Sequence, residues 1–182
     1  TPWRSLASQQ TFRFADDMAR LGISTPTNEP LAHDFIDEVI ALAEGLIDLG
    51  HAYVVEGSVF FAHDGVAERA GLTYEQALAL AAERGGEVDD PAKRDPLDAA
   101  LWVRSTADEP AWDSPWGPGR PGWHAECSAM ALATLGPGLD LHCGGADLAF
   151  PHHAFEAAQA EAVTGVAPFA RAWLRAGMVT RH

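Results

Sequence analysis

Residues 139–153 read LDLHCGGADLAFPHH, and this stretch decides the fold class of the chain. Its apolar start predicts a strand over residues 139–142, and its glycines predict a turn over residues 143–147. A helical pattern then begins at about His152 and runs to Val163. The stretch therefore predicts a strand, a turn and a helix in the order found in parallel α/β units.

The flanking sequence extends this alternation in both directions. A helix is expected over residues 124–135 and a final strand over residues 172–179. Helices and strands joined by short links are typical of one half of a parallel α/β sheet. Such a sheet binds its ligands at the carboxyl ends of the strands, and the 143–147 turn is expected at that end.

The first part of the chain predicts a different set of elements. Apolar residues recur at helical spacing in residues 5–21 and 32–49, so both helices are expected to belong mostly to the core. Residues 52–62 predict a β-hairpin. A short helix is expected over residues 73–84, where Thr73 has the side chain of an N-cap.

The composition changes over residues 85–121, which are rich in Gly, Pro and Asp. This segment predicts a long excursion with one strand near residues 101–103. The sequence contains no internal repeat and no low-complexity tract.

Charge and cysteine content narrow the class of protein. The formal net charge is −14, and Lys93 is the single lysine. A surface that holds RNA needs cations along the phosphate path, so this chain is not expected to be a main RNA-binding surface. Two cysteines are too few for a disulfide framework and indicate a reduced, cytoplasmic protein. No apolar run approaches the ~20 residues of a membrane helix, and the N-terminus has no signal-peptide pattern.

Cys127, His152 and Glu156 form a candidate metal site. His152 and Glu156 are four residues apart on an expected helix and therefore share a face. Cys127 lies near the start of another expected helix. A thiolate, an imidazole and a carboxylate together suit zinc. The same residues also fit a buried free cysteine beside two polar residues at a helix start, and spacing alone leaves both interpretations open.

Two segments carry a resemblance to a known family. They are residues 121–130, PGWHAECSAM, and the 139–153 stretch. Both closely resemble signature segments of cysteinyl-tRNA synthetase and of its relative, the mycothiol-biosynthesis cysteine ligase, which joins cysteine to an amino sugar. Residues 95–102 and 109–121 match as well, and a weaker resemblance covers the N-terminal helices and the hairpin.

The resemblance implies part of a Rossmann-type, class I synthetase catalytic domain of α/β class with a connecting insertion. Residues 1–50 would be its helical part, 51–120 the insertion, and 121–182 the second half with the zinc and cysteine site. In this family ATP activates the cysteine carboxylate as an adenylate, and an acceptor then captures the acyl group. Zinc selects cysteine because it separates sulfur from oxygen by ligand softness, whereas a shape pocket separates such similar side chains poorly.

The resemblance also gives the candidate site residues their roles. Cys127, His152 and Glu156 fall on zinc-ligand positions, and Trp123 and His142 fall on residues that line the cysteine pocket. The alternative for Trp123 is a core aromatic side chain. The alternative for His142 is a strand-end histidine that hydrogen-bonds to the backbone.

Gly144, Gly145 and Asp147 fall on the loop that meets the ribose of ATP in the resembling enzymes. Glycines permit close backbone approach, and a carboxylate accepts hydrogen bonds from ribose hydroxyls. Cys143 stands where the family segment usually has glycine. It is either a neutral replacement or a substitute zinc ligand.

Two family signatures are absent from this sequence. None of its eight histidines lies in a His-x-Gly-His motif, and a Lys-Met-Ser-Lys-Ser loop needs two lysines. Those motifs bring charge and donors to the reacting phosphates. The resemblance thus places the start of this chain after the first third of the catalytic domain, beyond a further cysteine ligand to zinc, and its end near the second signature.

Several functions remain open on this evidence. Residues 81–86, residues 93–98 and Phe155 look more like the mycothiol ligase, whereas His142 and Glu156 look more like the tRNA enzyme. We favour a mycothiol-type cysteine ligase that uses ATP, zinc, L-cysteine and an amine acceptor such as an amino sugar. A tRNA substrate is the second choice, and a non-catalytic zinc and cysteine-binding module is the third. The chain is also expected to depend on a missing N-terminal segment or a second chain, because half a parallel sheet leaves an open edge.

Overall fold

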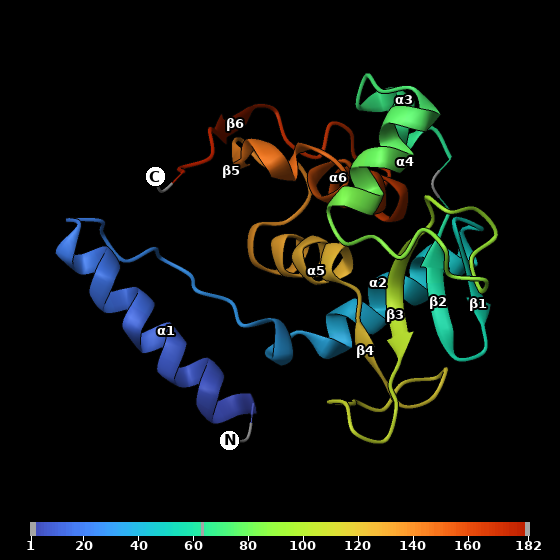
Figure 1. Cartoon of the computed structure of the whole chain (residues 1–182), viewed down its shortest axis with the longest axis horizontal. Helices are drawn as coiled ribbons and strands as arrows, with labels where there is room; N and C mark the ends of the chain where they lie inside the picture. Colours follow the sequence, from blue (N-terminus) through green and yellow to red (C-terminus); the bar gives the residue numbers. More distant parts are fainter. Residues whose placement is uncertain (1–2, 63, 181–182) are drawn as a thin grey trace. The chain divides into compact units, whose positions relative to one another are not determined.

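The computed structural model describes residues 3–62 and 64–180, which form two units that divide after Pro30. The first unit consists of helix α1 (Trp3–Arg20) and an irregular segment (Figure 1). The expectation that this helix lies in the core is wrong, because none of its residues is buried and Phe12 is 76% exposed. Helical spacing predicts an apolar face, but it does not tell whether the chain supplies a surface to cover that face.

The second unit is built on an antiparallel sheet of four strands in the order β1-β2-β3-β4. The strands are β1 (Ala52–Val55), β2 (Ser58–Phe61), β3 (Ala99–Arg104) and β4 (Gly119–Pro121). The expected hairpin is confirmed as β1 and β2, and the expected strand near residues 101–103 lies within β3. Glu56 and Gly57 form the hairpin turn with φ of 50° and 89°, the left-handed conformation that such tight turns require.

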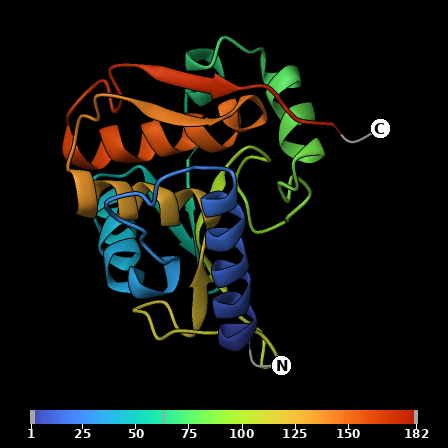
Figure 2. The same ribbon diagram turned by 90° about the vertical axis from the view of Figure 1, so that its left-hand side faces the viewer.

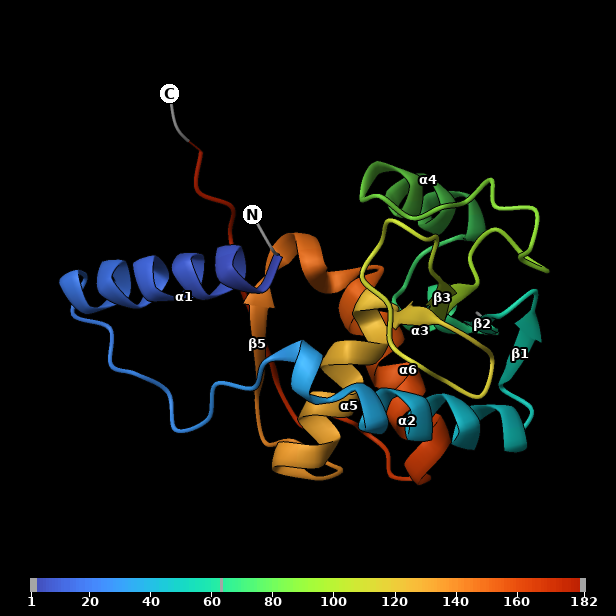
Figure 3. The same ribbon diagram turned by 90° about the horizontal axis from the view of Figure 1, so that it is seen from below.

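Helices cover one face of this sheet. The hydrophobic core continues from the sheet through these helices to a further helix packed on them. The short η1 (Ala32–Asp34) leads into α2 (Ile36–Asp48), which packs with α5 (Trp123–Leu135) against the sheet (Figure 3). Helix α6 (His152–Thr164) packs on α5 in turn. The largest fully buried apolar side chains of this core are those of Val39, Leu46, Val59, Leu101, Trp102 and Phe155. The expected core role of the second helix is thereby confirmed.

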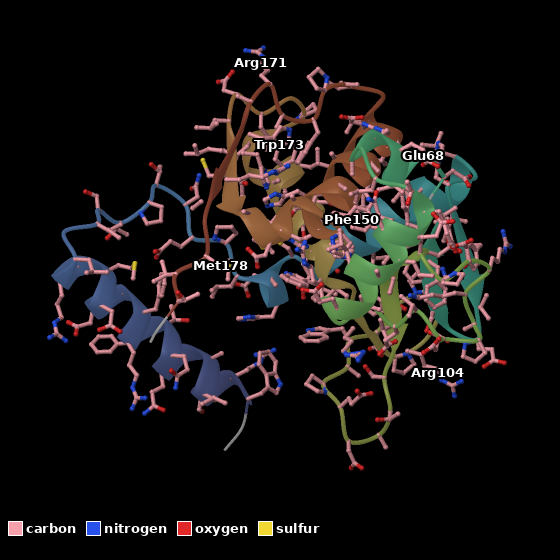
Figure 4. The ribbon with its side chains drawn as sticks, turned by 45° about the horizontal axis from the view of Figure 1, so that its top comes forward. Glu68, Arg104, Phe150, Arg171, Trp173 and Met178 are labelled. Atoms are coloured by element: carbon pink, nitrogen blue, oxygen red, sulfur yellow. The ribbon has the colours of Figure 1, made fainter. Side chains whose placement is uncertain are left out.

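Two short helices, α3 (Val66–Arg69) and α4 (Tyr74–Glu83), follow the hairpin. Thr73 caps α4 as expected: its Oγ1 accepts from the Gln76 backbone N–H at 3.3 Å, and Gln76 Oε1 accepts from the Thr73 N–H at 2.9 Å. Arg84, just after α4, donates to the backbone carbonyls of Asp147 and Phe150. Phe150 lies centrally, beside α4 and α6, in Figure 4. These two hydrogen bonds tie the end of α4 to the segment that precedes α6.

A separate pair of parallel strands, β5 (His142–Gly145) and β6 (Trp173–Ala176), runs beside α6 (Figure 2). The parallel arrangement is confirmed, but the first strand begins where the expected 139–142 strand ends. Leu139 forms only an isolated bridge to Ala170. Pairing with β6 draws the two glycines into the ladder, which overrides their low strand propensity. The expected glycine turn is therefore β5 itself, followed by the 3-10 helix η2 (Ala146–Ala149).

Within the ranges that the structure describes, no helix combines the length and the apolar character needed to cross a membrane.

Candidate functional site

Three side chains from two adjacent helices converge in the second unit. Cys127 comes from α5, and His152 and Glu156 come from α6. One potential ligand atom from each lies within 4.8 Å of the other two, and His152 Nε2 is 3.0 Å from Glu156 Oε1. In a tetrahedral zinc site, nitrogen and oxygen ligands lie about 3.3 Å apart, because each is about 2.0 Å from the metal. The spacing of the nitrogen and oxygen donors therefore fits zinc, and the sulfur, nitrogen and oxygen donors fit zinc in type.

Glu156 is the electrostatic centre of this cluster. Its side chain is only 2% exposed, and His142 Nε2 approaches its second oxygen, Oε2, at 3.1 Å. Burial by itself raises the pKa of Glu156, but the contacts from His142 and His152 outweigh burial and lower the pKa to about 2. Glu156 is therefore an anion in a mostly buried setting, which is a suitable ligand for a cation.

The two cysteines lie in different environments. Burial, with the negative charge of Glu156 added, raises the pKa of the Cys127 thiol to about 12. Cys127 is thus protonated near neutral pH until a metal displaces its proton. Cys143 on β5 is exposed and belongs to neither cluster of potential metal ligands in the described part of the chain. The geometry consequently gives no support to Cys143 as a substitute ligand.

Aromatic side chains at the start of α5 lie over the candidate metal ligands. Trp123 is 56% exposed and stacks on His152 with 4.4 Å between ring centres, so the core interpretation of this residue is wrong. His124, its neighbour, places Nδ1 at 2.7 Å from Nδ1 of His152. Its ring lies parallel to that of Phe155, 5.5 Å away. Burial lowers the pKa of His124 to about 3, which keeps the ring neutral.

The sequence reasoning did not select His124, although it lies inside the quoted PGWHAECSAM segment. The signal that could have found it is its spacing. His124 is three residues before Cys127, which places both side chains on the same face of α5.

A second group of ligand-type side chains shares Glu156. His142 and His153 each place an atom within 4.8 Å of the Glu156 carboxylate and of one another. His142, at the start of β5, packs its ring on Trp173 and contacts Glu156 rather than the backbone. Burial lowers the pKa of His153 to about 4. The structure thus brings His142 next to Glu156, one of the candidate metal ligands that the sequence spacing suggested.

The three residues expected at the nucleotide also lie together, at the end of β5. A Cβ on Gly144 would be 2.6 Å from His153 Cε1, and a Cβ on Gly145 would be 2.2 Å from Asp147 Oδ1. Both glycines therefore allow a neighbouring side chain to lie against the strand. Asp147 follows the carboxyl end of β5, as the sequence reasoning expected.

A cavity of about 530 Å³ opens beside the candidate metal ligands, of which His152 lines it. Trp123, His124 and His152 line its wall, and Asp147 lines it as well. Its cationic lining residues are Arg84, Lys93 and Arg120. Burial lowers the pKa of Lys93. The cavity volume is in the usual range for small-molecule sites.

Comparison with known proteins places the chain in a family. The model of the tRNA synthetases class I (C) catalytic domain matches residues 1–182. L-cysteine:1D-myo-inositol 2-amino-2-deoxy-alpha-D-glucopyranoside ligase of Mycolicibacterium vanbaalenii is 47% identical over 97% of this chain and 43% of its own length. Cysteine--tRNA ligase of Carboxydothermus hydrogenoformans is 47% identical over 96% of this chain and 37% of its own length. The chain thus spans about two fifths of the length of these relatives, and it belongs to the class I (C) tRNA synthetase catalytic domain family.

Proposed function

We propose that this chain is the cysteine-selecting part of an ATP-dependent ligase, in which zinc recognises the substrate thiol and cysteine is transferred to the amine of an amino sugar. The observation that carries the proposal is the convergence of Cys127, His152 and Glu156 beside an open cavity. The names of the relatives support it, because both types of relative are ligases of cysteine.

The protein side chains divide the work of recognition among themselves. A zinc ion held by this cluster supplies a soft Lewis acid that binds a thiolate in preference to a hydroxyl group. Glu156 is held as an anion by its contacts with His142 and His152, so its carboxylate offsets one of the two positive charges of a bound zinc ion in a buried place. Trp123 covers one face of the His152 ring, and Trp123 also lines the cavity. A small amino acid next to the cluster thus has an aromatic wall.

The ATP side of the site rests on the end of β5. We propose that Gly144 and Gly145 allow close approach of the ribose, and that the Asp147 carboxylate accepts hydrogen bonds from its hydroxyls. Asp147 lines the same cavity as Trp123. Residues 121–182 then form the second half of the Rossmann-type domain, residues 51–120 its insertion, and residues 1–50 its helical part.

The proposed acceptor is a small amine rather than a nucleic acid. The net charge of −14 and the single lysine, Lys93, disfavour a surface on this chain that binds the phosphate backbone of a nucleic acid. Phe155 is the feature of α6 that resembles the amino-sugar ligases, and it is buried under His124. We propose a cytoplasmic protein, consistent with two free cysteines.

Zinc content tests the cysteine site directly. The purified chain is loaded with zinc, and its loss to a chelator is followed with no addition, with L-cysteine and with L-serine. We expect about one zinc per chain, protected by cysteine and not by serine. Cys127→Ser should abolish tight binding, whereas Cys143→Ser, the matched control, should keep it. Equal protection by serine would refute selection of the thiol.

A second assay addresses the acceptor. Full-length ligase containing this segment is given ATP, cysteine and either 1D-myo-inositol 2-amino-2-deoxy-α-D-glucopyranoside or tRNA, and the products are identified by mass. Cysteinylation of the amino sugar alone supports the proposal. Cysteinylation of tRNA alone would assign the chain to the tRNA enzyme, and absence of ATP consumption with retained cysteine binding would indicate a non-catalytic module.

A further inference from the structure

Two histidine rings of the site approach each other through their Nδ1 atoms. Nδ1 of His124 on α5 lies 2.7 Å from Nδ1 of His152 on α6. When both rings are neutral, this hydrogen bond holds one proton, so one ring donates and the other accepts. Because a neutral imidazole carries one proton, the direction of this bond fixes which nitrogen is protonated on each ring.

The other nitrogen of His152 faces the metal cluster. His152 Nε2 lies 3.0 Å from Glu156 Oε1, and an ionised carboxylate can only accept a hydrogen bond. Without a metal, a neutral His152 therefore donates from Nε2 to Glu156. Its Nδ1 then has no proton and must accept from the Nδ1–H of His124.

Metal binding requires the opposite arrangement. A histidine ligand offers a nitrogen without a proton, so His152 Nε2 must release its proton to water before it takes a metal. The neutral ring then carries its proton on Nδ1 and donates it to His124. His124 accepts at Nδ1 and takes a proton from water at Nε2. For two neutral rings, the proton released by one is matched by the proton taken up by the other.

We propose that His124 is a positioning residue, which frees Nε2 of His152 for the metal by reversing the hydrogen bond between the two Nδ1 atoms. The inference rests on the proposed metal site. The packing holds His124 in place for this role. Its ring is parallel to Phe155, with 7° between the planes, and Ser128 Oγ donates to its backbone carbonyl at 2.9 Å. Partners on the far nitrogen of a histidine ligand typically change metal affinity 10–100-fold when removed.

Substitutions separate the hydrogen bond from the packing. His124→Phe keeps a flat ring against Phe155 but removes the acceptor, and we expect zinc affinity to fall about 10-fold or more. His124→Gln restores an amide that can donate or accept, so it should recover most of that loss. His51→Phe is the matched control, because His51 packs on Phe61 and is not among the potential metal ligands of the described residues, and it should leave zinc affinity unchanged. Zinc dissociation constants are measured by chelator competition, and thermal unfolding of each metal-free variant verifies the fold.

Nitrogen-15 NMR of the two rings tests the proton positions with and without zinc. In the metal-free chain we expect protonated Nε2 on His152 and protonated Nδ1 on His124. Zinc should exchange these positions, placing the proton on Nδ1 of His152 and on Nε2 of His124. Unchanged zinc affinity in His124→Phe, or a metal-free His152 that already carries its proton on Nδ1, would overturn the inference. If the wild-type chain fails to bind zinc, the proposed metal site is refuted instead. The spectrum of the metal-free chain requires no zinc, so it still tests the proton positions on the two rings in that case.

Discussion

Gly122 is the position where the smallest substitution should have the largest effect on the site. It precedes the first residue of α5 and donates its backbone N–H to the Leu101 carbonyl of β3 at 2.9 Å. A Cβ at Gly122 would lie 1.9 Å from the carbonyl oxygen of Ala100 and 2.6 Å from its carbonyl carbon. Gly122→Ala therefore forces the start of α5 away from β3, because a backbone atom cannot rotate aside.

The size of the effect follows from three contributions. Overpacking in a filled core typically costs about 1–3 kcal/mol, and a clash with backbone belongs at the upper end. Weakening the hydrogen bond to Leu101 adds about 1 kcal/mol. Gly122 has φ of −77° and ψ of 142°, which alanine adopts freely, so the lower entropy of the unfolded variant returns about 0.4–1 kcal/mol. The expected net loss in the free energy of unfolding is about 3 kcal/mol.

Equilibrium unfolding in urea measures this loss, followed by circular dichroism and tryptophan fluorescence. With a slope of about 2 kcal/mol per molar, the midpoint should fall by about 1.5 M. Gly177→Ala is the matched control, because a Cβ there meets nothing within 4 Å and its φ lies outside the left-handed range. It should change stability by less than about 0.5 kcal/mol. Equal midpoints for the two variants would refute the argument from backbone contact.

Two further predictions concern Tyr53 on β1 and Thr73 at the start of α4. Burial, with Asp98 as hydrogen-bond acceptor, raises the pKa of Tyr53 to about 12, so its contribution to stability is complete below pH 10 and is lost between pH 10 and 12. The difference in the free energy of unfolding between the wild type and Tyr53→Phe should shrink across that interval, and a constant difference from pH 9 to 12 would contradict the assignment. Thr73→Ala should cost about 1 kcal/mol by removing the cap that accepts from Gln76, whereas Thr73→Ser should cost little in the same urea titration, and equal midpoints for the two would argue against the capping role.

Local pattern predicted the helices of the second unit well but placed one strand incorrectly. Helical spacing and the Thr73 cap are properties of consecutive residues, so the sequence contains most of the information about them. The strand expected at residues 139–142 was placed too early because its true partner, residues 173–176, is distant in sequence. The exposed face of α1 was missed for a similar reason, since burial depends on other elements and not on spacing.

The candidate site shows the same division between local and non-local information. The i, i+4 spacing of His152 and Glu156 was sufficient to place two candidate ligands on one face. Their approach to Cys127 depends on how α5 packs on α6, which only the resemblance suggested beforehand. The contact between His124 and His152 follows from the same packing, and spacing of residues on one helix could not predict its 2.7 Å distance.

The convergence of Cys127 with His152 and Glu156 also allows a bound metal to cross-link the chain. A metal held by these side chains ties together two points of the chain and closes residues 128–151 into a ring. By the loop-entropy model used for covalent cross-links, a ring of about 25 residues restricts the unfolded chain by roughly 3 kcal/mol. That ring contains β5 and η2, where Gly144, Gly145 and Asp147 lie. Loading of the metal would thus stabilise the folded state of the ring that contains the segment proposed to hold the nucleotide, and its removal would reverse that stabilisation.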